Sequence, residues 1–258
     1  MPRYKLTIEY EGTRYSGWQA QKNARTVQGE LLGAARTVFQ TEDMELYGSG
    51  RTDSGVHALA QTAHLDVRTM LAPDIIRMKI NDELPADISL LRVEKVSSKF
   101  HARHDAEARS YLYQISRRRT ALGKRYVWWI KDKLDAAAMA SAAMEFSGMH
   151  DFRSFTADDP DEKSTKVAVE SCRVTESGSL ILVRITGSHF LWNMVRRMVG
   201  VLAEVGRGKL TPTDIALFLR KKSDAPAKLT APPSGLFLER VYYPGDKRYL
   251  DITPVVNL

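Results

Sequence analysis

The stretch KVAVESCRVTESGSLILVRITG, residues 166–187, decides between the fold classes open to this chain. Two runs that suit β-strands, 166–175 and 179–187, flank the dipeptide Ser177-Gly178. A short turn containing glycine between two such runs is typical of a β-hairpin. Consecutive strands of a doubly wound parallel sheet are separated by helices, so this hairpin favours an α+β fold instead.

Further strands and helices are predicted on both sides of the hairpin. Strands are predicted from alternating or β-rich patterns at residues 4–10, 44–47, 62–67, 88–96, 111–115 and 235–243. Helices are predicted after Thr26 and from Pro73, at 134–146 and 190–205, and after the cap Thr211-Pro212. Each half thus carries several strands and two or more helices. We expect two α+β domains, residues 1–105 and 106–258, that share one mixed, mostly antiparallel sheet.

Composition limits the classes of protein to consider. The 258 residues carry a formal net charge of +7, and this excess suits a phosphate-rich partner, although a basic protein need not have one. Cys172 is the only cysteine, which excludes an intramolecular disulfide and a thiolate metal cluster. No signal peptide and no apolar run long enough to cross a membrane are seen, so we expect a cytoplasmic protein.

The decapeptide GSGRTDSGVH, residues 48–57, is the strongest candidate for a chemical site. It holds Asp53 in a tight loop, and Arg51 could keep that carboxylate ionised in a dry pocket. Asp53 is therefore a candidate nucleophile, base or metal ligand. The pattern G-x-G-x-x-G is broken at Asp53, and Ser54 lacks the G-x-S-x-G context of a hydrolase nucleophile.

Metal and cofactor chemistry find little support in the sequence. The histidines near the loop are His57 and His64, and no H-E-x-x-H motif occurs. His64 shares the polar face of its strand with Thr62 and Asp66, so we expect it at the surface or lining a cleft. We expect neither a metal nor a cofactor.

Cationic and aromatic residues are interleaved in the second half of the chain. This combination suits RNA, whose phosphates attract cations and whose unstacked bases stack on aromatic faces. We expect at least two of the aromatic residues to belong to the core instead. The residues concerned are Arg117–Arg119, Lys124, Arg125, Lys221 and Lys222, with Tyr111, Tyr113, Tyr126, Trp128 and Trp129.

Arg196 and Arg197 lie in a strongly apolar helical segment, so we expect one of them to point into a polar site. A buried guanidinium needs a carboxylate partner, for which the Asp53 loop is the attractive candidate. The alternative is a surface arginine at the end of an amphipathic stripe.

At GRTDSGVH, residues 50–57, the chain resembles the tRNA pseudouridine synthase A family. Other landmarks of that family follow in its order along nearly the whole chain. They are Tyr15–Gln19, Asn81–Pro85, Phe100–Arg103, Ala108–Tyr111, Asp151–Phe155, Met194–Arg196 and Ala231–Leu236. Two departures are Ser54, where alanine is most common, and Trp192-Asn193, where other residues are usual.

The resemblance implies two ferredoxin-like halves with a central RNA-binding cleft, and a homodimer. It also implies an isomerase that converts uridine to pseudouridine at positions 38, 39 and 40 in the anticodon arm of tRNA, without cofactor or metal. Asp53 is then the nucleophile, Tyr111 contacts the substrate, Arg51 helps to hold the opened RNA, and Arg196 pairs with the aspartate. We also assign His57, the last residue of the loop motif, to substrate binding.

This chemistry agrees with what the residues themselves suggest. The uridine must be flipped out of its stack before its glycosidic bond can be exchanged. Attack by Asp53 on the base, attack on the ribose and an elimination route all remain open. The alternatives to a tRNA enzyme are a pseudouridine synthase for another RNA and a non-catalytic RNA-binding protein on the same fold.

Overall fold

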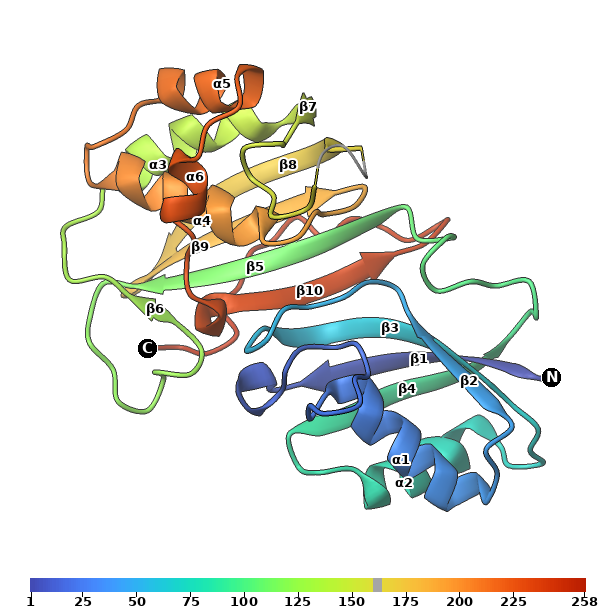
Figure 1. Cartoon of the computed structure of the whole chain (residues 1–258). Coiled ribbons are helices and arrows are strands. Elements are labelled where there is room, and N and C mark those ends of the chain that lie inside the picture. The colour runs from blue at the N-terminus through green and yellow to red at the C-terminus, as the bar shows by residue number, and fades with distance from the viewer. Residues whose placement is uncertain (160–163) are drawn as a thin grey trace. The chain divides into compact units, whose positions relative to one another are not determined.

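The computed structural model, which describes residues 1–159 and 164–258, divides into two units that each join strands to helices (Figure 1). Unit 1 comprises Met1–Glu107 and Phe237–Lys247, and unit 2 comprises Ala108–Leu236 and Arg248–Leu258. The predicted ranges 1–105 and 106–258 differ from these units chiefly in Phe237–Lys247, which returns to unit 1. A strand can rejoin a distant part of the chain because pairing depends on tertiary contacts, which no local pattern records.

Unit 1 contains strands in the order β4-β1-β3-β10, with β2 also paired to β3. Strand β1 is antiparallel to both β3 and β4, whereas β10 is parallel to β3. The strands are β1 (Arg3–Tyr10), β2 (Met44–Gly48), β3 (His57–Val67), β4 (Ile88–Val96) and β10 (Leu236–Tyr242). Tyr4, Leu6, Ile8 and Tyr10 are all buried, which confirms the alternation predicted for the first strand.

The two helices of unit 1, α1 (Val27–Phe39) and α2 (Pro73–Glu83), pack against each other. The Thr26 side chain caps α1, because its Oγ1 accepts a hydrogen bond from Gly29 N at 3.2 Å. Pro73 occupies the first turn of α2. Both predicted helix starts are therefore confirmed.

Unit 2 contains strands in the order β5-β9-β8-β7, with β6 paired parallel to β5. Strands β8 and β9 form the predicted antiparallel hairpin, and Gly178 in its turn has the left-handed φ of 57° that favours glycine. The strands are β5 (Ala108–Ser116), β6 (Trp128–Trp129), β7 (Gly148–Asp151), β8 (Lys166–Ser177) and β9 (Leu180–Gly187). The α+β class is confirmed, while the sharing of one sheet by both halves around a cleft stays a prediction.

The helices of unit 2 are α3 (Ala136–Ala143), α4 (Met194–Gly206), α5 (Pro212–Arg220) and α6 (Ala225–Lys228). The prediction that the apolar segment 190–205 is helical from Phe190 onward is wrong. Asn193 adopts a left-handed conformation with φ of 62°, so the helix begins only at Met194. Thr211 and Asp214 form a complete capping box at the start of α5, as the sequence pattern indicated. No helix of the described residues is both long and apolar enough to cross a membrane.

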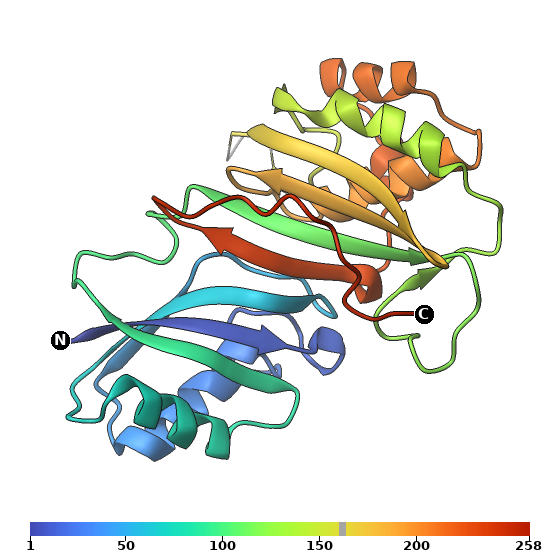
Figure 2. The ribbon, with the colours of Figure 1, turned by 180° about the vertical axis from the view of Figure 1, so that it is seen from behind.

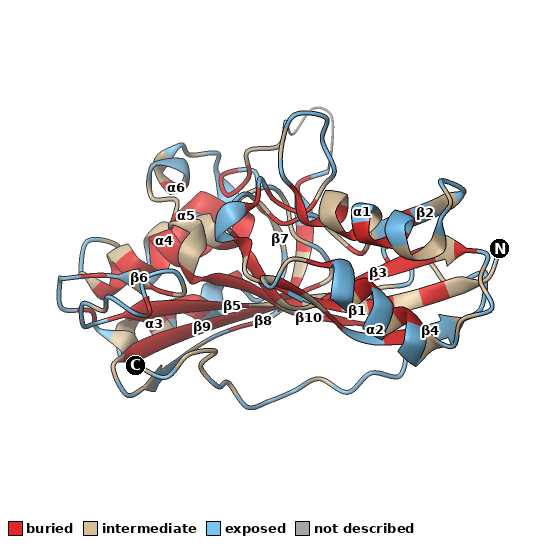
Figure 3. Ribbon diagram, turned by 90° about the horizontal axis from the view of Figure 1, so that it is seen from below, coloured by how far each residue is buried: buried red, intermediate tan, exposed pale blue. Residues whose placement is uncertain are grey.

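Strand β9 is buried along its entire length (Figure 3). Within unit 2, helices cover one face of the strands, and the segment 248–258 crosses the other face (Figure 2). The buried Arg184 of β9 ties this segment down, because its Nη2 donates to Asp251 O at 2.6 Å and its Nη1 to Tyr249 O at 3.2 Å. Ile252, Val255, Val256 and Leu258 add apolar contacts beside Leu112.

His64 departs from the expected surface position. It is 1% exposed, its ring stacks on Tyr47 with 5.3 Å between centroids, and His101 packs edge-on against it at 4.8 Å. Its Nδ1 accepts a hydrogen bond from Ala102 N at 3.1 Å. Burial, followed by the charges of Arg3 and His101, lowers the pKa of His64 to about 4. The segment that covers this face of β3 is distant in sequence, so period-2 alternation could not reveal it.

Candidate active site

The loop that carries Asp53 is fastened at its first end to strand β3. Ser49 N donates to Thr62 O at 2.8 Å, and Ser49 Oγ donates to Gln61 Oε1 at 2.7 Å. Gln61 is fully buried, and its Nε2 donates to Gly50 O at 3.1 Å. The backbone that leads to Arg51 and Asp53 is therefore set by buried polar groups rather than by the loop residues alone.

The second end of the loop rests on the Tyr15–Gln19 landmark. Trp18 N donates to Thr52 O at 3.2 Å, and Tyr15 O accepts from Gly55 N at 3.3 Å and from Ser54 Oγ at 3.1 Å. The backbone turn closes on Asp53 itself, whose carbonyl accepts from Val56 N at 3.2 Å. The Tyr15–Gln19 landmark thus supports the aspartate loop.

Two glycines make this close approach of backbones possible. A Cβ on Gly12 would lie 1.9 Å from Val56 O, and a Cβ on Gly17 would lie 2.5 Å from Thr52 O. Gly17 also has a φ of 89°, which side chains other than glycine rarely adopt. The loop position therefore depends on glycines outside the motif that carries the aspartate.

Asp53 is partly exposed and Arg51 is exposed. That Arg51 keeps the carboxylate of Asp53 ionised in a dry pocket stays a prediction. The backbone of the loop is held at Ser49 and at Thr52–Gly55.

His57, the last residue of the loop motif, is buried. Its side chain is 1% exposed and stacks on Phe237 with 4.8 Å between ring centroids. Its Nδ1 accepts a hydrogen bond from Gly12 N at 2.9 Å. These contacts of His57 support the fold of unit 1, and its predicted contact with substrate stays a prediction.

Tyr111 and Arg196 both belong to unit 2. Tyr111 lies on β5 opposite Ile185 of β9, is partly exposed, and meets Phe190 edge-on with 5.1 Å between ring centroids. Arg196 lies in the first turn of α4 and is partly exposed. The predicted pairing of Arg196 with Asp53 spans the two units and stays a prediction.

Arg196 organises the Ala231–Leu236 landmark. Its Nε donates to Ala231 O at 2.7 Å, and its backbone carbonyl accepts from Ala231 N at 3.0 Å. The next residue, Pro232, accepts a hydrogen bond from the hydroxyl of the buried Tyr113 at 2.8 Å. Burial raises the pKa of Tyr113 well above its usual value, so this hydroxyl is a donor at neutral pH.

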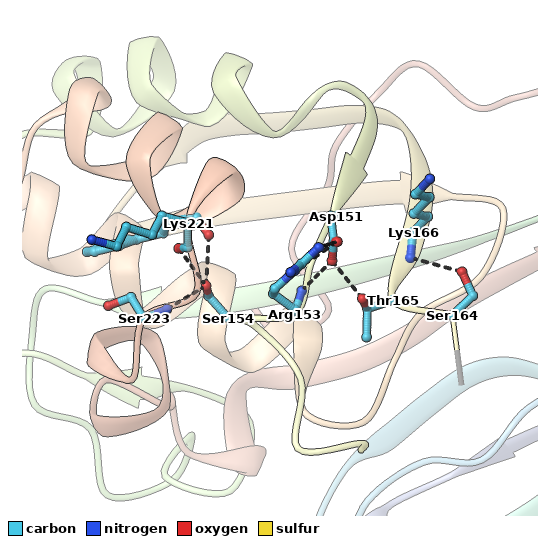
Figure 4. Close-up of polar contacts among 9 residues, drawn as sticks. Asp151, Arg153, Ser154, Ser164, Thr165, Lys166, Lys221 and Ser223 are labelled. Carbon is cyan, nitrogen blue, oxygen red and sulfur yellow. Dashed lines mark hydrogen bonds and ion pairs between the residues drawn. The ribbon is translucent and has the colours of Figure 1, made fainter. Parts of the chain in front are cut away.

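The Asp151–Phe155 landmark is a structural brace (Figure 4). Ser154 Oγ lies 2.8 Å from Phe218 O and 3.3 Å from Lys221 O, and accepts from Ser223 N at 3.0 Å. Asp151 binds Arg153 and accepts from Thr165 Oγ1 at 2.6 Å. The landmark thereby binds Thr165 on one side and the residues at the end of α5 on the other.

The basic and aromatic residues of unit 2 divide between core and surface. Of the five aromatic residues, Tyr113 alone is fully buried, so fewer belong to the core than predicted. Trp129 is 41% exposed, and the guanidinium of Arg119 lies 5.7 Å from its ring centroid. In the part of the chain that the structure describes, no cluster of three or more His, Cys, Asp or Glu residues is arranged to hold a metal ion.

Comparisons with known proteins confirm the predicted family. A family model described as tRNA pseudouridine synthase matches residues 6–105 and 142–244. Proteins named tRNA pseudouridine synthase A from Brucella ovis and Brucella canis are 43% identical over 248 residues, which cover 94% of this chain and 98% of theirs. A chain in a solved Cbf5-Nop10-Gar1 complex is 11% identical, with a TM-score of 0.37 over 91% of this chain and 57% of that chain. The chain therefore belongs to the tRNA pseudouridine synthase A family, a family of isomerases.

Proposed function

We propose that this protein converts uridine to pseudouridine at positions 38, 39 and 40 in the anticodon arm of tRNA, with Asp53 as nucleophile. The observation that supports the proposal most is the presentation of Asp53. Its carboxylate stands on a loop anchored at both ends and is partly exposed, within the region that the family model matches. A braced, accessible carboxylate suits covalent or acid-base catalysis on a large substrate.

The reaction is an exchange of bonds with no net loss of atoms. The bond between N1 of the uracil and C1′ of the ribose breaks, the base turns, and a bond from C5 to C1′ forms. The hydrogen on C5 is then removed as a proton, and N1 gains a proton. Attack of the carboxylate at C6 of the base, attack at C1′ and an elimination route all use an ionised Asp53.

The proposal also gives roles to the other site residues. The target base must leave its stack before Asp53 can reach it, at a cost of a few kcal/mol. Arg51 is exposed on the same loop, so it can bind phosphate or brace the opened RNA. In this proposal Tyr111, which is partly exposed, stacks on the uracil and assists the removal of the C5 proton, and Arg196 pairs with Asp53.

An assay with tritiated tRNA tests both the reaction and its position. Transcripts labelled with tritium at C5 of uridine, and carrying a single uridine at 38, 39 or 40 in the anticodon arm, are incubated with the protein. We expect release of tritium from these transcripts and none from a transcript that lacks all three uridines. Release only from ribosomal RNA would indicate a different RNA substrate, and binding without release would indicate a non-catalytic RNA-binding protein.

The active form is proposed to be a homodimer. Nothing in a single chain tests this, and light scattering of the purified protein measures it directly.

A further inference from the structure

The loop between β9 and α4, residues 188–193, exposes a tryptophan. The side chain of Trp192 is 56% exposed, although tryptophan is among the residues with most to gain from burial. Two residues earlier, Phe190 packs edge-on against Tyr111. The exposed indole of Trp192 thus follows Phe190 by two residues, and Phe190 contacts Tyr111, which is proposed to contact the substrate.

The backbone of Trp192 is held by several hydrogen bonds. Trp192 N donates to Asp158 Oδ2 at 2.9 Å, and Trp192 O accepts from Ala157 N at 3.1 Å and from Thr156 Oγ1 at 3.3 Å. Thr156 Oγ1 also lies 3.1 Å from Asp158 Oδ2. A side chain on so fixed a backbone loses less conformational entropy when a ligand stacks on it.

The following residues fix the loop from the other side. Asn193 is left-handed, and its Oδ1 accepts from Arg196 Nη1 at 3.0 Å. Arg197 is partly buried and donates to Thr156 O, and burial together with the charge of Arg196 lowers the pKa of Arg197. The tryptophan therefore sits between a braced segment at 156–158 and the first turn of α4.

The chain carries a formal net charge of +7, and two arginines follow Trp192 in the first turn of α4. Arg196 Nη1 donates to Asn193 Oδ1, Arg197 donates to Thr156 O, and the carboxylate of Asp158 is turned toward Trp192 N and Thr156 Oγ1. A flat aromatic face beside cations is the combination that binds unstacked nucleobases together with their phosphates.

We propose that Trp192 is a stacking platform for a base of the tRNA loop that is displaced from its stack next to the target uridine. Trp192 is a binding and positioning residue and takes no part in bond exchange. The inference rests on the proposed action on the anticodon arm. It predicts that this position contributes to affinity for tRNA while the chemical step at saturating tRNA is unchanged.

The test compares Trp192→Ala and Trp192→Phe with the unaltered protein. Stacking of one base on an aromatic ring contributes about 1–3 kcal/mol, so we expect Trp192→Ala to raise KM and Kd for tRNA by about 5- to 150-fold. The kcat for tritium release is expected to stay within about twofold, and Trp192→Phe is expected to recover most of the affinity. The matched control is Leu217→Ala, which removes a side chain of 53% exposure on α5 and is expected to change neither quantity.

Fluorescence distinguishes stacking from a structural role. We expect tRNA to quench tryptophan emission of the unaltered protein, and this quenching to fall in Trp192→Phe even though binding persists. Affinity and quenching in Trp192→Ala that equal those of the unaltered protein would overturn the inference. A Trp192→Ala protein whose oligomeric state changes while its affinity for tRNA does not would overturn it too. Failure of the proposed function appears separately, as an absence of tritium release from the unaltered protein.

Discussion

Two loops present the candidate functional side chains, and they are held in different ways. The Asp53 loop of unit 1 is fixed by hydrogen bonds of its own backbone to β3 and to the Tyr15–Gln19 segment, at distances that Gly12 and Gly17 make possible. The loop that carries Trp192 in unit 2 has backbone bonds from Ser188 N to Ala168 O and from Ala157 N to Trp192 O, and it also depends on the side chains of Asp158 and Arg196. The first arrangement places a reactive group rigidly, and the second can change its contacts with single side-chain substitutions.

The largest effect is expected from filling the space that the first loop needs. Gly12→Ala puts a methyl group 1.9 Å from Val56 O, so either the loop or the turn that carries Gly12 must shift. We expect a loss of at least about 2–3 kcal/mol in the free energy of unfolding, together with loss of tritium release. Urea denaturation measures the first and the tRNA assay the second.

The control for this substitution lies in the same loop. A Cβ on Gly50 meets no atom within 4 Å, so Gly50→Ala is expected to change stability by no more than about 0.5 kcal/mol. Equal stabilities of the two variants would show that close backbone approach does not hold the Asp53 loop.

Acid is expected to lower the stability of unit 1, because the buried His64 on β3 resists protonation in the folded state. The pKa of His64 is lowered from 6.5 to about 4, so the unfolded chain binds this proton more readily than the folded one between those values. Its contribution to stability is full above pH 6.5 and is lost as pH falls toward 4. The charge of His101 also lowers the pKa of His64, whereas the charges of Asp66 and Asp105 raise it.

The variant His64→Asn isolates this contribution. Asn keeps an acceptor for Ala102 N but cannot titrate, so its stability should depend less on pH between 7 and 4.5. We expect the difference between the two proteins to change by about 2 kcal/mol across that range, as measured by urea denaturation. Parallel curves for variant and unaltered protein would mean that His64 is not held neutral by burial.

The smallest effect is expected where side chains hold the second loop. Asp158→Ala removes the acceptor for Trp192 N and for Thr156 Oγ1, at a cost of about 1 kcal/mol. We expect KM for tRNA to rise several-fold because the indole is less well placed. Asp158→Asn retains an acceptor oxygen and should restore most of the affinity.

Comparing Asp158→Ala with Trp192→Ala tests how far the second loop depends on this side chain. If Asp158→Ala leaves KM unchanged while Trp192→Ala raises it, the indole binds without needing the Asp158 side chain. The backbone hydrogen bond from Ala157 N to Trp192 O would then be enough to hold the second loop.

Local signals in the sequence predicted much of the fold. Thr26 and Thr211 cap helices through contacts within a few residues, and Gly178 marks a turn between adjacent strands. Contacts between distant segments were not predictable in this way. The burial of His64 beneath Ala102 and the return of residues 237–247 to unit 1 are both of this kind.

The site shows the same division. Asp53 and Arg51 were selected from one compact motif, and their roles stay predictions; the landmark segments were selected by their order along the chain. The supporting role of His57 was missed because its partners Gly12 and Phe237 are remote in sequence. The apolar run before Met194 suggested a continuous helix, and the left-handed Asn193 that ends this continuity also exposes Trp192 in the loop.

The most direct test of the account replaces the carboxylate of Asp53 by the amide of the same shape. In single-turnover assays with tritiated tRNA, the account predicts that Asp53→Asn releases no tritium above background while its Kd for tRNA and its stability match those of the unaltered protein. The exposed carboxylate of Asp43 provides the control, because Asp43→Asn should react at the unaltered rate. Tritium release by Asp53→Asn at the rate of the unaltered protein would contradict the assignment of Asp53 as nucleophile.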